Sequence, residues 1–461
     1  MASAQPQLLR QLGVFSATVI VVSNMVGTGI FTTTGFLAGD LGSPPLVVGI
    51  WFVGALMALS GALCFSELGI NFPRSGGEYV YLTEAWGPMW GFLSGWVSFF
   101  AGFSAPIAAA ALALSEYLGY FFPSLGAREG GPGLALGPIT LRPGPAQMVA
   151  CVVVAAFTLL NIFGLLRVAR IQNFLTTVKV AVIAAFIVAG VLAGSGDWAH
   201  FSAPAARTSP NSLPAQFLLS LVFVYFGYSG FNAAAYIAEE LRDPERTLPR
   251  ALIAGTALVT LLYVLLNVTF LYAAPLESMK GVVRVGAHAS QALFGPAVAG
   301  IFAGLMAFSL LSTVNAMTII GPRVYYAMAV NGAFFPAAAR VHPRWHTPWI
   351  AVLAQGACTL LLILIPTFES LVQYIGFCLM FFTMFAVVGL FRLRRRPGWR
   401  PLAAVNLAFP LIPAFYALSC AVVLICMVVL RPAASGYGVL TAVCGAALYR
   451  VAVRPRAEAP R

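Results

Sequence analysis

Long apolar runs separated by short polar connections set the pattern of this chain. Twelve runs of about 20 mostly apolar residues can be marked, each long enough to cross the hydrocarbon core of a bilayer. They begin near Gly13, Leu46, Pro88, Ala146, Ile171, Leu213, Ala251, Ala292, Trp349, Leu371, Leu407 and Tyr437. The pattern predicts an all-α polytopic membrane protein with 12 transmembrane helices, forming one transmembrane domain over residues 1–461.

Two of these runs are interrupted by glycine near their middle. Residues 24–31 of the first run read NMVGTGIF, and residues 226–232 of the sixth read FGYSGFN. Each glycine in a helix interior costs about 1 kcal/mol, so both helices are expected to unwind there. Unwound backbone at this depth must face protein or a water-filled cavity. The alternative left open is that these glycines only allow close helix packing.

An unwound helix frees N–H groups on one side of the break and carbonyl groups on the other. The N–H end favours a carboxylate and the carbonyl end favours a cation. An α-amino acid carries both groups on one carbon atom. The breaks fall in runs one and six, as expected for an inverted repeat. We therefore expect a first repeat at 13–194 (helices 1–5), a second at 213–396 (helices 6–10), and helices 11 and 12 at 406–452.

Composition narrows the class of protein. Of 461 residues, 60% are hydrophobic and only 9% are charged, against about 25% charged in soluble proteins. With the N-terminus inside, 19 of the 26 Lys and Arg residues fall on the cytoplasmic side and six outside, leaving Lys179 within a run. The net charge of +12 thus indicates topology and no nucleic-acid partner. It predicts a multi-pass protein of the plasma or inner membrane with both termini in the cytoplasm.

Four motifs in chain order resemble a known family. They are residues 24–31, residues 65–69 through 73–79, residues 239–250, and residues 322–329 with 331–332 and 347–348. The chain resembles the amino acid–polyamine–organocation (APC) transporter superfamily, in its branch of L-type and cationic amino acid permeases. The resemblance implies a LeuT-like fold, with a 5+5 inverted repeat, two further C-terminal helices, and helices 1 and 6 unwound in mid-membrane.

The resemblance also implies a substrate site at the two breaks. The substrate carboxylate would be held by backbone N–H groups of Thr28, Gly29 and Ile30, beside Gly27. The amino group would be held by carbonyls of Met25, Phe226, Gly227 and Ser229, beside Gly230. Phe226 would close over the substrate from outside, although one more core aromatic is the plain alternative.

Lys179 is the most informative single residue. A lysine at the centre of a membrane helix costs about 2.5–3.5 kcal/mol on insertion scales. It lies nine residues after Arg170, so its side chain could also extend to the membrane surface. In the family resembled, a lysine of the fifth helix sits where sodium binds in sodium-coupled relatives. This implies sodium-independent transport, or a coupled proton on Lys179, with Ser309, Ser312 and Thr313 as neighbours.

Other charged residues are expected to be structural. Glu67 lies near a span end, and Glu239 and Glu240 precede Arg242, Arg246 and Arg250 in a cytoplasmic charge cluster. That cluster either braces an inward-closed state or is a solvated helix end.

The expected function is secondary active transport of a small neutral amino acid by alternating access, through a permease or exchanger embedded in the lipid bilayer. Neutral substrates are favoured because the middles of spans 1, 3, 6, 8 and 10 carry no carboxylate. The alternatives are a cationic amino acid or polyamine exchanger and a non-transporting amino acid sensor. The sequence shows no catalytic, metal-binding or channel-filter motif, so we expect no enzyme activity and no cofactor. It leaves proton coupling and the oligomeric state open.

Overall fold

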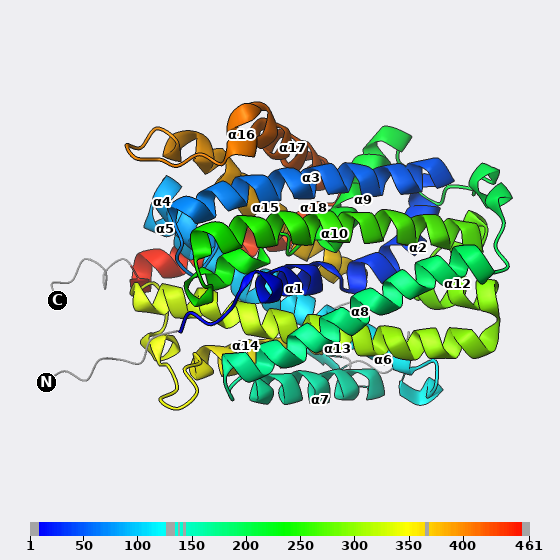
Figure 1. Ribbon diagram of the computed structural model, residues 1–461, viewed down its shortest axis with the longest axis horizontal. Helices are drawn as coiled ribbons and strands as arrows, with labels where there is room; N and C mark the ends of the chain where they lie inside the picture. The colour runs from blue at the N-terminus through cyan, green and yellow to red at the C-terminus, as the bar shows by residue number, and fades with distance from the viewer. Residues whose placement is uncertain (1–8, 126–133, 137–138, 142–143, 365–367, 454–461) are drawn as a thin grey trace, which may run out of the picture.

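The computed structural model of the chain is an elongated bundle of long helices that run along its longest axis (Figure 1). It describes residues 9–125, 134–136, 139–141, 144–364 and 368–453. The described chain begins and ends at the same end of the bundle, on the left in Figure 1. We call this the terminal end.

The first half of the chain is mostly helical and includes one pair of short strands. Its elements are α1 (Val14–Met25), α2 (Thr28–Leu41), α3 (Pro44–Asn71), α4 (Glu78–Trp86), α5 (Pro88–Val97), the π-helix η1 (Ser98–Ser104), α6 (Ala105–Leu118), η2 (Pro123–Leu125), the antiparallel strands β1 (Leu134–Leu136) and β2 (Ile139–Leu141), α7 (Pro145–Leu160), α8 (Leu165–Ala193) and η3 (Trp198–Ser202).

The second half is helical in its described part. Its elements are α9 (Leu213–Tyr228), η4 (Ala233–Glu240), α10 (Pro244–Ala273), α11 (Leu276–Met279), α12 (Val285–Phe294), α13 (Pro296–Val330), η5 (Pro336–Ala339), α14 (Trp349–Ile363), α15 (Phe368–Leu393), α16 (Ala403–Leu407), α17 (Leu411–Leu430), α18 (Pro432–Leu448) and η6 (Tyr449–Val453).

A helix overlaps each of the twelve apolar runs marked in the sequence. Within the described residues, nine helical segments are long and apolar enough to cross a membrane, and the shorter α7 and α14 are also apolar. The run that begins near Ala292 forms one helix of 35 residues, α13, preceded by the separate α12. The prediction of a polytopic, mainly helical membrane protein is therefore confirmed at this level.

The outer faces of the bundle carry large apolar side chains, as the lipid-facing surface of a membrane protein does. Phe15, Leu192, Ile301 and Leu361 are each more than 60% exposed. Polar side chains lie inside instead, where helix-to-helix hydrogen bonds satisfy many of them. This arrangement reverses the order found in a soluble protein and fits a chain solvated by lipid.

Helices that hold matching places in the two halves of the chain pack against each other. The broken pair α1–α2 contacts the broken pair α9–η4, and α3 packs along α10. In the same way α6 packs on α13 and α7 on α14. α8 is the last long helix of the first half and contacts α1, α10 and α13. It therefore joins the broken helix α1 to two long helices of the second half.

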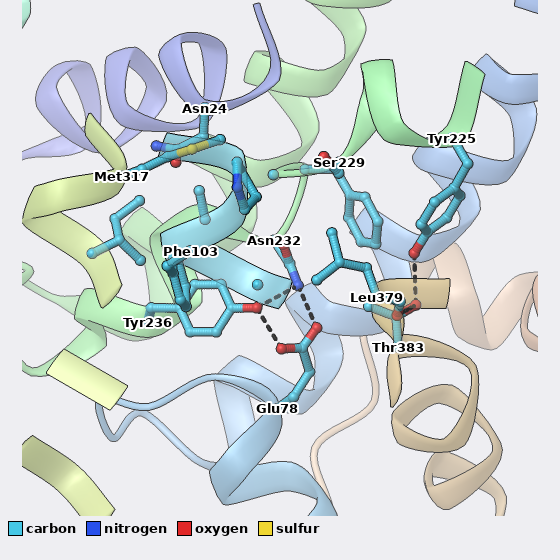
Figure 2. Close-up of a pocket in the computed structure, with 16 residues that line it drawn as sticks. Asn24, Glu78, Phe103, Tyr225, Ser229, Asn232, Tyr236, Met317, Leu379 and Thr383 are labelled. Atoms are coloured by element: carbon cyan, nitrogen blue, oxygen red, sulfur yellow. Dashed lines mark hydrogen bonds between the residues drawn. The ribbon is translucent and has the colours of Figure 1, made fainter. Parts of the chain in front are cut away.

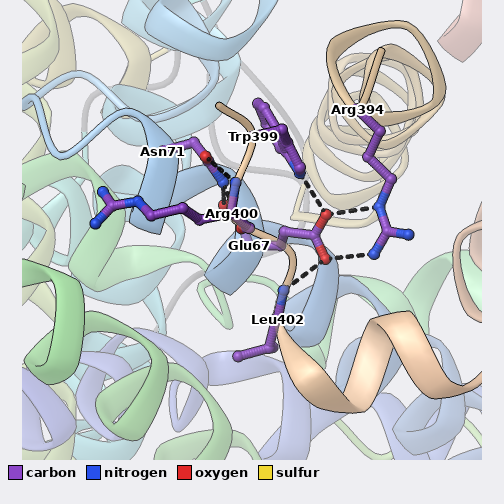
Figure 3. Close-up of polar contacts among 6 residues, drawn as sticks. All are labelled: Glu67, Asn71, Arg394, Trp399, Arg400 and Leu402. Atoms are coloured by element: carbon purple, nitrogen blue, oxygen red, sulfur yellow. Dashed lines mark hydrogen bonds and ion pairs between the residues drawn. The ribbon is translucent and has the colours of Figure 1, made fainter. Parts of the chain in front are cut away.

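A buried carboxylate ties the helices together at the terminal end (Figure 3). Glu67 of α3 is fully buried and accepts hydrogen bonds from Arg394 Nε and Nη2, each at 2.7 Å. Trp399 Nε1 donates to it at 2.8 Å and the Leu402 amide at 3.0 Å. The four donors join α3 to the end of α15 and the segment that follows, which agrees with the structural role expected of Glu67.

Replacing Arg394 by methionine is expected to lower the melting temperature of the purified protein clearly. The change strips a buried carboxylate of its counter-charge, which typically costs about 3–5 kcal/mol. Glu245→Gln is the matched control, because it breaks the exposed pair with Arg400 and should leave the melting temperature unchanged. Equal melting temperatures for the two variants would contradict the role assigned to Glu67.

Candidate functional site

The first helix is interrupted where the sequence predicted. α1 ends at Met25 and α2 begins at Thr28. Between them Val26 has φ −76° and ψ 87°, and Gly27 has φ −132° and ψ −148°, so neither continues the helix. The first N–H groups of a helix have no partner within it, and no side chain caps α2. The amides of Thr28, Gly29 and Ile30 thus lie in the first turn of an uncapped helix.

The sixth apolar run is interrupted as well. α9 ends at Tyr228 and η4 begins at Ala233, with extended backbone at Ser229 and a left-handed φ of +96° at Gly230. The Ser229 hydroxyl donates to the Phe226 carbonyl at 2.7 Å, which partly satisfies the open end of α9.

The two breaks touch through glycine. A Cβ atom placed on Gly29 would lie 2.5 Å from Gly227 Cα, and one placed on Gly230 would lie 2.8 Å from Asn24 Cβ. No side chain fits at either contact. The close-packing role that the sequence left open is therefore present, and it occurs at the breaks themselves.

A small cavity, the break cavity, lies where the breaks meet α6 and α13. Its lining residues are Asn24, Met25, Gly27, Thr28, Gly29, Pro106, Ala110, Phe226, Ser229, Thr313 and Met317. Six of the nine predicted substrate residues are among them. Ile30 and Gly227 do not line it, Gly227 lies against Gly29, and Gly230 lines the adjoining cavity described below.

Tyr263 of α10 holds the two breaks together and was not predicted. Its hydroxyl lies 2.5 Å from the Met25 carbonyl and 3.0 Å from the Gly227 carbonyl. The Phe226 carbonyl has its own donor, the Ser229 hydroxyl. The carbonyls of Met25, Phe226 and Gly227, three of the four predicted to hold an amino group, thus already have a protein donor. Each carbonyl oxygen has two lone pairs and can accept a second hydrogen bond.

Lys179 reaches the break from α8. Its side chain is 1% exposed, and Nζ lies 2.6 Å from the Val26 carbonyl and 2.9 Å from Thr313 Oγ1. Thr313 Oγ1 also donates to the Val26 carbonyl at 2.9 Å. The alternative in which the side chain extends to the membrane surface is wrong, because the ammonium group points into the bundle.

The other two predicted neighbours of Lys179 lie elsewhere. Ser312 Oγ is 2.6 Å from Ser23 Oγ, and Gln172 Nε2 donates to both hydroxyls. Ser309 Oγ is buried without a hydrogen-bond partner among the described residues. Ser312 therefore supports the ammonium site through Ser23, whose Oγ is 3.5 Å from Lys179 Nζ, while Ser309 does not contact it.

A polar network continues from Ser23 and Ser312 away from the break, and sequence reasoning missed most of it. Asn315 Nδ2 donates to Gln172 Oε1 at 2.8 Å, and Asn161 Nδ2 donates to Asn315 Oδ1 at 2.9 Å. A signal was available, because Gln172, Thr176 and Lys179 recur at the spacing of one helix face.

The charge cluster at the exit of η4 differs from the expectation. Glu240 pairs with Arg323 of α13 at 2.8 Å, and both side chains are 1% exposed. Arg323 lies near the end of α13, and the charge cluster expected from the sequence did not include it. The sequence also placed Glu240 with Arg242, Arg246 and Arg250, but Arg246 pairs with Asp243 instead. The difference arises because the pair joins η4 to α13, two segments 83 residues apart in the chain.

A second small cavity, the Glu78 cavity, adjoins the break cavity and shares Asn24, Pro106, Ser229 and Met317 with it (Figure 2). Figure 2 shows Asn232, Tyr236 and the Glu78 carboxylate joined by hydrogen bonds at its edge. Asn232 thus forms a hydrogen bond across to α4. The spans themselves offer no carboxylate here, but α4 does, and the sequence did not reveal it.

Comparison with known proteins identifies the family of this chain. The family model described as amino acid permease matches residues 12–447. The chain is 30% identical over 454 residues to the large neutral amino acids transporter small subunit 2 of Oryctolagus cuniculus, covering 97% of this chain and 81% of that protein. It is 28% identical over 412 residues to the serine/threonine exchanger SteT of Bacillus subtilis, covering 88% of each. It is also 27% identical over 463 residues to the Asc-type amino acid transporter 1 of Mus musculus, covering 98% of this chain and 83% of that protein. A chain with two glycine breaks that meet beside a buried lysine, matched by this model over nearly its whole length, belongs to the amino acid permease family of the APC superfamily.

Proposed function

We propose that this protein is a secondary active transporter that moves a small neutral amino acid by alternating access, as a permease or exchanger. The observation that carries the proposal is the meeting of two broken helices around one cavity. The free N–H groups at the start of α2 favour a carboxylate, and the carbonyls at the ends of α1 and α9 favour an ammonium group. An α-amino acid carries both groups on one carbon atom.

The proposed topology is that of a LeuT-like fold with 12 transmembrane helices and both termini in the cytoplasm. The repeats are 13–194 and 213–396, followed by two helices at 406–452. The packing of α3 on α10, α6 on α13 and α7 on α14 supports it, because repeats related by a central two-fold axis bring equivalent helices together. The broken helices, α3 and α10 would rock against α6, α7, α13 and α14.

In the proposed site the substrate carboxylate binds the amides of Thr28, Gly29 and Ile30. The ammonium group binds the carbonyls of Met25, Phe226, Gly227 and Ser229, and the Phe226 ring covers the substrate. Gly27 and Gly230 shape the two breaks. Neutral substrates are supported by the break cavity, whose described lining carries no charged side chain. Two of the relatives are named for substrates of this kind, one for large neutral amino acids and one for serine and threonine.

Sodium independence is proposed from Lys179. Its Nζ donates to the Val26 carbonyl and to Thr313, so a hydrogen-bond donor occupies the carbonyl end of the first break. When protonated, this group would stabilise the unwound backbone without an ion from solution.

The proposed function is tested by uptake of radiolabelled amino acids into proteoliposomes. Alanine, serine, threonine or leucine is expected to be taken up, and the rate is expected to stay unchanged when choline replaces sodium. A rate that collapses in choline would overturn the role of Lys179. Displacement by arginine or putrescine, but not by alanine or leucine, would favour the cationic alternative. Binding without flux would identify a sensor.

A further inference from the structure

The Glu78 carboxylate lies at the junction of α4 with the unwound part of the sixth run. Asn232 Nδ2 donates to Glu78 Oε1 at 2.8 Å, and the Tyr236 hydroxyl donates to Glu78 Oε2. Asn232 Nδ2 also lies 3.1 Å from the Tyr236 oxygen. Asn232 at the break and Tyr236, four residues later in η4, therefore both bind a single carboxyl group that is 2% exposed.

These contacts belong to a thin wall between two cavities. On one side lies the Glu78 cavity, with a volume of about 30 Å³, which is enough for a water molecule. On the other lies a cavity of about 420 Å³ at the terminal end, lined by Ser75, Tyr79 and Glu239 among others. Ser75 Oγ accepts from the Glu239 amide, and the Gly76 amide donates to the Tyr236 carbonyl. The wall is thus residues 75–79 packed on 236–239.

The wall fits closely because of glycine. Gly77 has a left-handed φ of +53°, and a Cβ atom there would lie 2.5 Å from the Tyr236 ring. The chain entering α4 can therefore lie directly against Tyr236, which brings Glu78 to its two donors. Separating this contact would join the terminal-end cavity to the Glu78 cavity and, through their shared residues, to the break cavity.

No described positive charge faces Glu78. The other titratable groups close to Glu78 are neutral near pH 7. They are Tyr81, Tyr225, Tyr236 and Cys378. The charged groups on the elements packed around Glu78 either pair with other residues or line the terminal-end cavity. Arg74 pairs with Glu84, Arg323 with Glu240, and Arg394 with Glu67, while Glu239 lines the terminal-end cavity. A buried carboxylate without a counter-charge is high in free energy.

We propose that Glu78 is a proton-binding site whose protonation is linked to closure of the wall between the terminal-end cavity and the substrate site. Water on the terminal side supplies the proton, which adds to one carboxylate oxygen. The neutral carboxyl keeps its contact with Tyr236 by donating to the hydroxyl oxygen. The gating part of this proposal rests on the proposed transport function, whereas proton binding itself does not.

Protonation of Glu78 favours the closed wall, because its pKa is higher when the wall is closed than when it is open. In the closed wall, burial raises the pKa of Glu78 to about 7, although the bonds from Tyr236 and Asn232 oppose the rise. When the wall opens, water reaches the carboxylate and its pKa falls towards the ordinary value. The closed wall therefore holds the proton more tightly. Closure is favoured as the pH falls below about 7, and this advantage is lost as the pH rises through it.

The transport test compares the rate of amino acid exchange at pH 8 with the rate at pH 6, with the pH equal on the two sides of the membrane. A neutral amino acid keeps its net charge over this range. The wild-type rate is expected to fall about tenfold at pH 6, because the linkage shifts the wall towards closure by about that factor. Glu78→Gln should be slow at both pH values, and Glu78→Asp should keep the pH dependence.

Glu239→Gln is the matched control, because its carboxyl lines the terminal-end cavity but does not contact Tyr236 or Asn232 in the network. It is expected to keep the wild-type fall. A fall that persists in Glu78→Gln, or a wild-type rate equal at both pH values, would overturn the proposal.

A second measurement does not depend on transport. Infrared difference spectra of the purified full-length protein between pH 6 and pH 8 should show a protonated carboxyl band that is missing in Glu78→Gln. Absence of this band from the wild-type spectrum would overturn proton binding at Glu78. If the band is present but no amino acid is exchanged, the proposed transport function fails while the proton site stands.

Discussion

Lys179→Met is expected to slow amino acid exchange by about 30-fold or more. The change removes the ammonium hydrogen bonds to the Val26 carbonyl and to Thr313 Oγ1, while the apolar stem is largely kept. Hydrogen bonds to a charged group contribute about 1.5–3 kcal/mol each, and 1.4 kcal/mol corresponds to a factor of ten. Exchange rates in proteoliposomes, normalised to the amount of inserted protein, measure the effect.

Thr177→Ala is the matched control for Lys179→Met. Thr177 lies on the same helix two residues earlier, is exposed, and bonds only to the Asn173 carbonyl of its own helix. Its rate should equal that of the wild type. If Lys179→Met exchanges amino acid as fast as Thr177→Ala, the buried ammonium has no part in transport.

Gly29→Ala is expected to weaken substrate binding by one to two orders of magnitude. A Cβ atom at this position meets the Gly227 backbone at 2.5 Å, so the two breaks must separate. Overpacking of this kind costs about 1–3 kcal/mol, and it moves the amides that face the carboxylate. Binding of labelled substrate to the purified protein measures the loss directly.

Gly49→Ala is the matched glycine control. Gly49 lies in α3 with no atom within 4 Å of an added Cβ, so binding should be unchanged and the helix should be slightly favoured. Melting temperatures of both variants separate loss of the site from loss of the fold. A folded Gly29→Ala protein with wild-type affinity would remove the breaks from the substrate site.

The features predictable from the sequence were those that lie along a single helix. The breaks at Gly27 and Gly230 were visible because glycine inside an apolar run contradicts helix propensity. Lys179 was visible because a charge inside such a run is costly. Its contact with Thr313 followed from the family resemblance, while the inward direction of its side chain needed the packing of α8 against α1 and α13.

The features that escaped prediction depend on contacts between segments far apart in the chain. Glu78 lies on a short polar helix outside the long spans and gains meaning only where that helix meets Tyr236. Tyr263 is one of 15 tyrosines, and nothing in its own helix marks it. Arg323 meets its partner Glu240 across 83 residues of chain, so their pairing depends on the packing of α13 against η4.

The Tyr263 hydroxyl has one hydrogen atom and stands against two acceptors, the Met25 and Gly227 carbonyls. In the proposed site it would therefore act as a partial substitute for the ammonium group of a substrate. Acceptors that would otherwise be bare in the unloaded state are partly satisfied, which lowers the free energy of that state. A carrier with a stable unloaded state is able to reorient without cargo. In the proposed transporter, this single hydroxyl would favour net flux down a concentration gradient in addition to one-for-one exchange.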